Sequence, residues 1–258
     1  MEKSLMKILQ TALLTSLLTG LLSSFANTAS ADTTLTFTDK KNKVAMKMQF
    51  ANNMMRATSV DDNSTYMIYD ANNTTFTTFL TDKRQYFVMG QKEIEALSDI
   101  GAMMDKMLEK QLAEIPASQR EMMRGMIEGM LKSQMPKQVA KPEYNFTGKS
   151  SSYNGFDCEI VIKKTNKKKS KFCVTEYSKL GMKASEFAVI TSFQHTIESL
   201  AQQYGADNSM DFSSLGNYIP VNYKQAGETG TLTEVNHDNL SPAIFSIPDG
   251  FSKMEMPF

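Results

Sequence analysis

The chain has 258 residues, with 28 basic and 28 acidic side chains, two histidines and two cysteines. Charges of both signs are interspersed along it, so it has no general electrostatic field that would hold nucleic acid or an anionic membrane. We therefore predict no nucleic-acid partner and at most peripheral contact with a membrane.

The first 31 residues are typical of a cleavable secretory signal peptide. Lys3 and Lys7 form a short basic region, an apolar run over residues 8–22 follows, and residues 29–31 are the small side chains that a signal peptidase selects. The apolar run is shorter than the roughly 20 residues of a membrane-spanning helix. We expect cleavage before Asp32 and a periplasmic protein, or a secreted one where the host lacks an outer membrane.

The part after the signal peptide, residues 32–258, is predicted to be a single periplasmic domain. Without Glu2, Lys3 and Lys7 it carries 26 basic and 27 acidic side chains, so its net charge is close to zero. Its length suits one domain better than two.

Residues 32–90 alternate apolar and polar side chains with a period of two, which is typical of half-buried antiparallel strands. Short polar turns interrupt the alternation. We predict a meander of six strands, near residues 35–37, 44–50, 54–60, 65–70, 74–80 and 85–89.

The period changes after Gly90. Apolar residues then recur at three- and four-residue spacing up to Ile115, which predicts an amphipathic helix that Pro116 ends. Ser118 and Glu121 form a capping box that opens a second amphipathic helix. We therefore predict a helical insertion at about 91–134.

The two cysteines, Cys158 and Cys173, are expected to form a disulfide, because an exported chain folds in an oxidising compartment. They lie on strand-like segments around a lysine-rich tip. A turn at residues 165–166 would place the two cysteines directly opposite each other. That register turns Phe172 and Val174 away from the isoleucines of the other strand, so a bulge or a different tip remains an alternative.

The rest of the chain continues the mixed pattern. The lysines of residues 163–171 predict a solvated hairpin tip, with contact to lipid headgroups or an acidic partner as the alternative. A third helix is predicted over Ser185–Tyr204. Two further strands, at 218–224 and 230–235, precede an apolar closing segment at 241–251.

Methionine is the most unusual component, with 20 residues in the chain and eight between Met103 and Met135. Flexible thioether side chains can repack around apolar partners of different shapes. We predict that they form a movable cover over an apolar cavity between sheet and helices; ordinary core filling is the alternative. The expected ligand-binding residues are Met103, Met104, Met107, Met122, Met123, Met126, Met130, Phe187 and Phe193.

Catalytic and cofactor motifs are absent from the sequence. His195 and His237 have no matched nucleophile or ligands beside them, and there is no phosphate-binding loop or nucleophile elbow. We predict that the protein is not an enzyme, with no cofactor and no metal site. The alternative is a Cu(I)-handling protein, because the spacing of Met123, Met126 and Met130 suits soft ligands on one helix face.

The order of the elements, the segment Gly155-Phe156-Asp157-Cys158-Glu159 and the closing segment Phe245–Phe251 together resemble an uncharacterised family of bacterial envelope proteins. That family is similar in turn to the periplasmic lipoprotein carriers of the LolA/LolB type. The resemblance implies a LolA-like α+β fold, in which a curved antiparallel sheet, an unclosed half-barrel, wraps over helices.

By analogy, the resemblance implies a carrier for an apolar ligand, namely a lipid, an acyl chain or a lipidated or apolar protein segment. We further expect a monomer. A structural or interaction module with a filled core is a third possibility.

Overall fold

A computed structural model describes residues 31–59, 64–98, 108–110, 112–113, 115–116, 119–120, 122–126, 142–165, 168–203, 213–225 and 228–255. Residues Asp32–Phe258 form one compact unit, and Met1–Ala31 form a separate one. The signal peptide remains a prediction, because residues 1–30 lie outside the described part. Within that part, no helix has the length and apolar character needed to cross a membrane.

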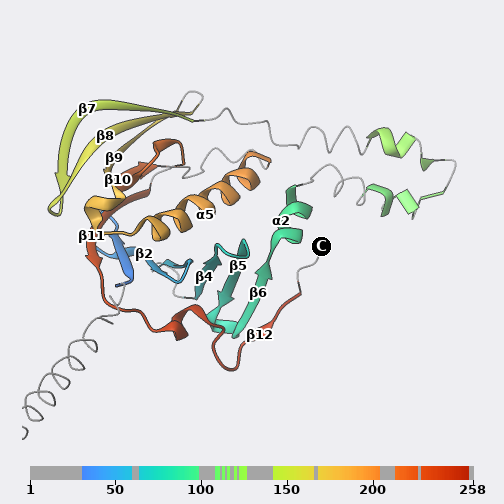
Figure 1. Ribbon diagram of the computed structural model, residues 1–258. Coiled ribbons are helices and arrows are strands. Elements are labelled where there is room, and N and C mark those ends of the chain that lie inside the picture. The colour runs from blue at the N-terminus through green and yellow to red at the C-terminus, as the bar shows by residue number, and fades with distance from the viewer. Residues whose placement is uncertain are drawn as a thin grey trace, which may run out of the picture. The chain divides into compact units, whose positions relative to one another are not determined.

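Within the described residues, twelve strands form one sheet (Figure 1). Their order across the sheet is β12-β6-β5-β4-β3-β2-β1-β11-β10-β9-β8-β7, and only β12 and β6 run parallel. The strands are β1 (Thr33–Thr38), β2 (Val44–Ala51), β3 (Met54–Ser59), β4 (Thr65–Asp70), β5 (Thr75–Leu80), β6 (Gln85–Met89), β7 (Glu143–Tyr153), β8 (Phe156–Thr165), β9 (Lys168–Glu176), β10 (Tyr218–Gln225), β11 (Glu228–Asn236) and β12 (Ser252–Lys253).

Helices make up a smaller part of the structure. The α-helices with described bounds are α2 (Gln91–Ser98) and α5 (Ala184–Gln203), and the 3-10 helices are η1 (Thr81–Lys83), η2 (Tyr177–Leu180), η3 (Ser213–Leu215) and η4 (Pro242–Phe245).

Helical residues also lie on both sides of Pro116, at 108–110 and 112–113 before it and at 120 and 122–126 after it. Arg124 forms an ion pair with Glu109, and Arg120 Nη2 donates to the carbonyl oxygen of Ala113 at 3.5 Å. These contacts join the segments before and after the proline, and the predicted pair of helices over 91–134 stays a prediction, because most of it lies outside the described residues. The capping residues Ser118 and Glu121 lie outside the described residues.

The predicted fold class, an α+β half-barrel wrapped over helices, is wrong. The structure is mainly a large open mixed sheet with few helices. Periodicity identifies individual strands, but it does not report which strands pair over long sequence separations. The pairing of β1 with β11 merges the N-terminal meander and β7–β11 into one sheet, and the two-residue strand β12 makes the sheet mixed.

One face of the sheet, here called the inner face, packs against α5. The Tyr69 hydroxyl lies 2.7 Å from Ser192 Oγ, and the ring of Phe193 meets Tyr69 edge-on and also lies against Phe76. The inner-face side chains that are at most 3% exposed include Leu35, Phe37, Phe50, Met55, Tyr69, Phe76 and Leu232. Burying these large apolar side chains is the main stabilising contribution to the fold.

The opposite face, here called the outer face, is covered over β3–β6 by the C-terminal segment. Phe245 of η4 is buried in a second apolar cluster with Ala51, Tyr66, Ile68 and Phe79. Arg56 stacks 4.2 Å above the Tyr66 ring, and its Nη1 donates to the carbonyl oxygen of Ile244 at 3.3 Å. Burial raises the pKa of the Tyr66 hydroxyl, and the Arg56 charge opposes this.

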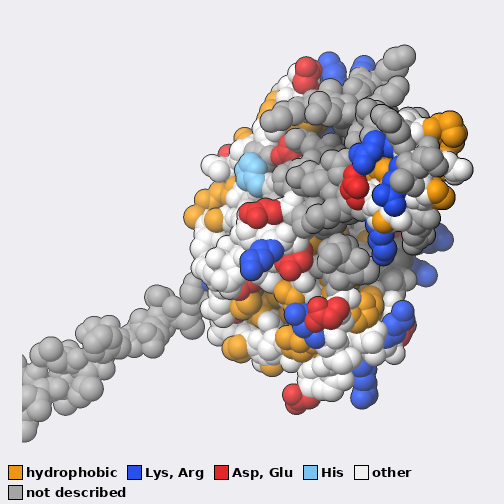
Figure 2. Space-filling model, turned by 90° about the vertical axis from the view of Figure 1, so that its right-hand side faces the viewer, with side chains coloured by type: hydrophobic (Ala, Val, Ile, Leu, Met, Phe, Trp, Pro, Cys, Tyr) orange, Lys and Arg blue, Asp and Glu red, His pale blue; other side chains and the backbone are white. Residues whose placement is uncertain are grey.

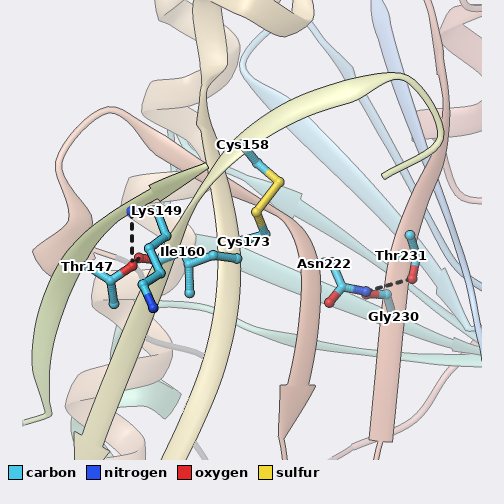
Figure 3. The surroundings of a disulfide bond; sticks show 8 residues. All are labelled: Thr147, Lys149, Cys158, Ile160, Cys173, Asn222, Gly230 and Thr231. Atoms are coloured by element: carbon cyan, nitrogen blue, oxygen red, sulfur yellow. Dashed lines mark hydrogen bonds between the residues drawn. A yellow bond between two sulfur atoms is a disulfide. The ribbon is translucent and has the colours of Figure 1, made fainter. Parts of the chain in front are cut away.

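The predicted disulfide is confirmed, but its register is not. Cys158 and Cys173 are bonded, with their Cα atoms 5.4 Å apart (Figure 3). Thr165 pairs with Lys168 and Ile160 pairs with Cys173, so the hairpin tip lies one residue later than predicted. The bridge therefore crosses a diagonal of the ladder, and the expected directly facing placement is wrong. A different tip had been the alternative.

Strand β7 forms one edge of the sheet and has an irregularity in its middle. Its pairing with β8 shifts register between Phe146 and Ser150, with Gly148 at a φ of 68°. Thr147 Oγ1 bridges the gap by donating to the carbonyl oxygen of Ile160 at 2.8 Å and accepting from Lys149 N at 3.3 Å (Figure 3). Such a bulge disfavours the addition of a strand from another chain at this edge.

Candidate functional site

The inner face of β2–β6 is organised in rows that run across the strands. Strand register places one side chain from each strand in such a row. The row that faces α5, here called the covered row, is almost entirely buried. It consists of Phe50, Met55, Tyr69, Phe76 and Met89.

The next row, two residues further along each strand, is different. It consists of Met48, Ala57, Met67, Thr78 and Phe87, and we call it the apolar strip. All five side chains are only half-buried. The strip therefore lies on the same face as the core and directly beside it, yet each of its side chains keeps an accessible part.

On the side away from α5, polar side chains follow the strip on three of its five strands. The following inner-face positions are Ser59 in β3, Thr65 in β4 and Gln85 in β6, whereas those in β2 and β5 are the apolar Met46 and Leu80. Two residues of a strand span about 7 Å, and four interstrand spacings from β2 to β6 span about 19 Å. The strip is thus five strands long and about one side chain wide over β3, β4 and β6, and the apolar surface is wider at β2 and β5.

The chemistry of the strip is that of an apolar contact surface. It has two thioethers, an aromatic ring and a methyl group, and its one polar atom is the hydroxyl oxygen of Thr78. Without a charged group it offers no general acid, base or anion clamp. It can bind an apolar group through burial and dispersion, with Met48 and Met67 adapting to shape.

The structure places the predicted cover methionines in different surroundings. Met122 and Met126 are 70% and 59% exposed, and Met123 is half-buried. The other four, Met103, Met104, Met107 and Met130, lie outside the described residues.

The two predicted phenylalanines take part in the packing of α5. Phe187 stacks on Tyr177 with ring centroids 4.5 Å apart, and Phe193 packs on the covered row. Within the described residues, both rings therefore stabilise the helix against its neighbours.

No group of three or more His, Cys, Asp or Glu side chains suited to a metal ion occurs among the described residues. The alternative Cu(I) site cannot be assembled from them either, because Met130 of the predicted triplet lies outside that part. His195 is exposed on α5, and His237 has an exposed side chain whose Nδ1 is 3.4 Å from Thr33 Oγ1.

Sequence reasoning missed the apolar strip and misjudged Lys163. Alternation had assigned Met48 and Met67 to a core face, but only the register shows that they share a row beside α5. Lys163 was predicted on a solvated tip, yet it is 3% exposed, with Nζ 5.8 Å from the centroid of the Tyr144 ring. The signal for this burial was the position of Lys163 on a strand, opposite Tyr144 and next to Ile162.

The surface agrees with the balanced charge of the sequence. On the face shown in Figure 2, basic and acidic side chains of the described residues alternate, with hydrophobic side chains scattered between them. No extended field of one sign appears among the described residues on this face.

Comparison with known proteins does not place the chain in a family. No family model matches it, and no curated protein matches it. Among solved structures, PNGF-II in a P21 crystal form is similar with a TM-score of 0.41 and 8% identity over 88% of this chain and 32% of that one. PNGF-II in a C2 crystal form gives 0.40 and 8%, over 88% and 31%. The chain thus spans about a third of PNGF-II, and likeness at this level carries no functional argument.

Proposed function

We propose that this is an exported, non-enzymatic protein that binds an apolar ligand along the apolar strip of its inner face. The observation that carries the proposal is the half-burial of Met48, Ala57, Met67 and Phe87 beside an almost entirely buried row of the same face. A face that served only as core would bury both rows to a similar degree.

The dimensions of the strip favour one kind of ligand. An α-helix with its side chains is about 10–12 Å in diameter, which is wider than the roughly 7 Å of the strip over β3, β4 and β6. A single extended hydrocarbon chain matches the length of the strip and its width over β3, β4 and β6. An acyl chain, free or as part of a lipid or a lipidated protein, is therefore the ligand class that we propose.

The methionine-rich segment is proposed as the adaptable part of the binding surface. Met122 and Met126 lie one helical turn apart and both expose more than half of their surface. Exposure of two large apolar side chains costs free energy unless they meet an apolar partner. The disulfide is consistent with export to the periplasm.

The direct test is a titration of the mature protein with a fluorescent sixteen-carbon fatty acid. We expect saturable binding that Met67→Gln weakens about tenfold, because loss of apolar contact worth roughly 1.5 kcal/mol corresponds to that factor. Met54→Gln is the matched control, because Met54 is also half-buried but lies on the outer face. It should bind like the wild type.

Two results would contradict this function. One is the absence of saturable binding by a folded wild-type protein that also yields no lipid on extraction. The other is equal weakening by Met67→Gln and Met54→Gln, which would indicate general destabilisation. Thermal melts of both variants separate loss of binding from loss of fold.

A further inference from the structure

Glu186, in the first turn of α5, is a buried carboxylate with one unused oxygen. The residue is 5% exposed. Its Oε2 accepts hydrogen bonds from Thr33 Oγ1 at 2.8 Å and from Lys183 N at 2.9 Å. Its Oε1 is inaccessible and has no hydrogen-bond partner among the described residues. A buried acceptor without a hydrogen-bond donor costs free energy. We therefore expect a donor beside Oε1.

The nearby polar groups are already engaged. Thr33 is fully buried, and its single hydroxyl proton goes to Glu186. Thr33 Oγ1 can therefore only accept from His237 Nδ1, at 3.4 Å, which orients the imidazole toward the threonine. No ion pair found within the described part of the chain involves Glu186.

Asp32 lies directly before Thr33 and is held in place. Its Oδ2 accepts a hydrogen bond from Leu240 N at 2.9 Å. Cleavage before Asp32 would turn its backbone nitrogen into an α-ammonium group with three donors and a positive charge. This group would then be one residue away from the threonine that touches Glu186.

We propose that the α-ammonium group of Asp32 in the cleaved protein binds Glu186 and supplies the donor for Oε1. The pair joins the start of β1 to the start of α5, and it forms only after the preceding residues are removed. Cleavage would thereby complete the packing of α5 on the sheet. The proposal rests on the predicted cleavage site and is independent of the apolar-ligand function.

The test compares the thermal melts of two otherwise identical chains. One begins at Asp32, and the other has a single glycine before Asp32, which moves the ammonium group by one residue, about 3.8 Å. We expect the melting temperature of the extended chain to be at least about 4 °C below that of the chain that begins at Asp32. In a Glu186→Gln background the extension should have no effect.

Glu93→Gln is the matched control variant. Glu93 stands at the same position of α2 and accepts from Gly90 N at 2.9 Å, as Glu186 accepts from Lys183 N. It is not buried like Glu186, and hydrogen bonds from its own amide and from Gly90 lower its pKa. A chain with Glu93→Gln should keep the full effect of the extension.

A third chain covers the case in which Glu186→Gln does not fold. The wild-type chain beginning at Asp32 with an acetylated amine should melt like the glycine-extended one, because the charge is lost without any change in sequence. Equal melting temperatures of the free, acetylated and extended chains would overturn the proposal. So would an extension effect of the same size with glutamate and with glutamine at residue 186.

Discussion

At the scale of single residues, Gly181 shows how one position depends on both backbone and neighbour. It ends η2 with a φ of 70°, a conformation that L side chains rarely adopt. A Cβ atom there would lie 2.7 Å from His237 Nε2. Glycine is thus required by the turn and by the imidazole that lies against it.

Gly181→Ala is expected to lower the free energy of unfolding by about 2 kcal/mol or more, from the left-handed backbone and the steric conflict together. Gly148→Ala is the control: its φ is 68°, but nothing lies within 4 Å of its Cβ position. It should cost about 1 kcal/mol, for the backbone alone. Urea unfolding measures both. Equal costs would mean that His237 moves aside freely.

At the scale of elements, the β8–β9 hairpin is held by its disulfide and by burial on both faces. Val161 and Phe172 face one side, and Ile160 and Cys173 face the other, and all four are at most 8% exposed. Apolar side chains on both faces remove the alternation that a half-buried strand shows. The bond also restricts the unfolded chain, because it closes a loop with a sequence separation of 15.

Replacing both Cys158 and Cys173 by alanine should lower the free energy of unfolding by about 3 kcal/mol. Denaturant unfolding with and without a reducing agent measures this. Reductant should destabilise the wild type by a similar amount and leave the variant unchanged. A wild type insensitive to reductant under unfolding conditions would contradict the expected contribution of the bond.

At the scale of the whole molecule, the sheet carries an inner and an outer apolar cluster on the two faces of β2–β6. The inner cluster packs against α5, and the outer one packs against the C-terminal segment. The main chain of that segment also continues the sheet, because Ser252 N donates to the carbonyl oxygen of Arg84 and Met254 N to that of Tyr86. The segment therefore covers a face and protects the edge of β6.

Phe245→Ala should lower the free energy of unfolding by about 3 kcal/mol, because it empties the centre of the outer cluster. Ile247→Ala is the control. Ile247 is 48% exposed in the same segment, and its truncation should change stability by no more than about 0.5 kcal/mol. Chemical denaturation measures the free energy of unfolding of both variants. A similar, small cost for both would show that the segment contributes little to stability.

Much of the secondary structure was predictable because it depends on local periodicity. The six strands of the meander were predicted to within about two residues, and the third helix, expected at Ser185–Tyr204, is α5, Ala184–Gln203. The two-residue strand β12 was missed, because so short a strand has no period to detect. The hairpin tip was misplaced by one residue, since several turns fitted the same lysine-rich segment.

The candidate site was less predictable, for a reason that the strip illustrates. Alternation assigned Met48 and Met67 to an apolar face, but their burial depends on which row of that face α5 covers. The phenylalanines expected to bind ligand, Phe187 and Phe193, belong instead to the packing of α5. Neither result follows from spacing along the chain.

The sequence alone determined the strands of the meander and the helix α5, because these depend on residues close together in the chain. It also determined the pairing of Cys158 with Cys173, because the chain has only two cysteines. Tertiary structure decided that β1 joins β11 in a single mixed sheet of 12 strands among the described residues, and that the apolar strip beside α5 is only half-buried. Those outcomes depend on contacts between distant segments, and hydrophobic attraction is non-directional, so a one-dimensional pattern does not specify them.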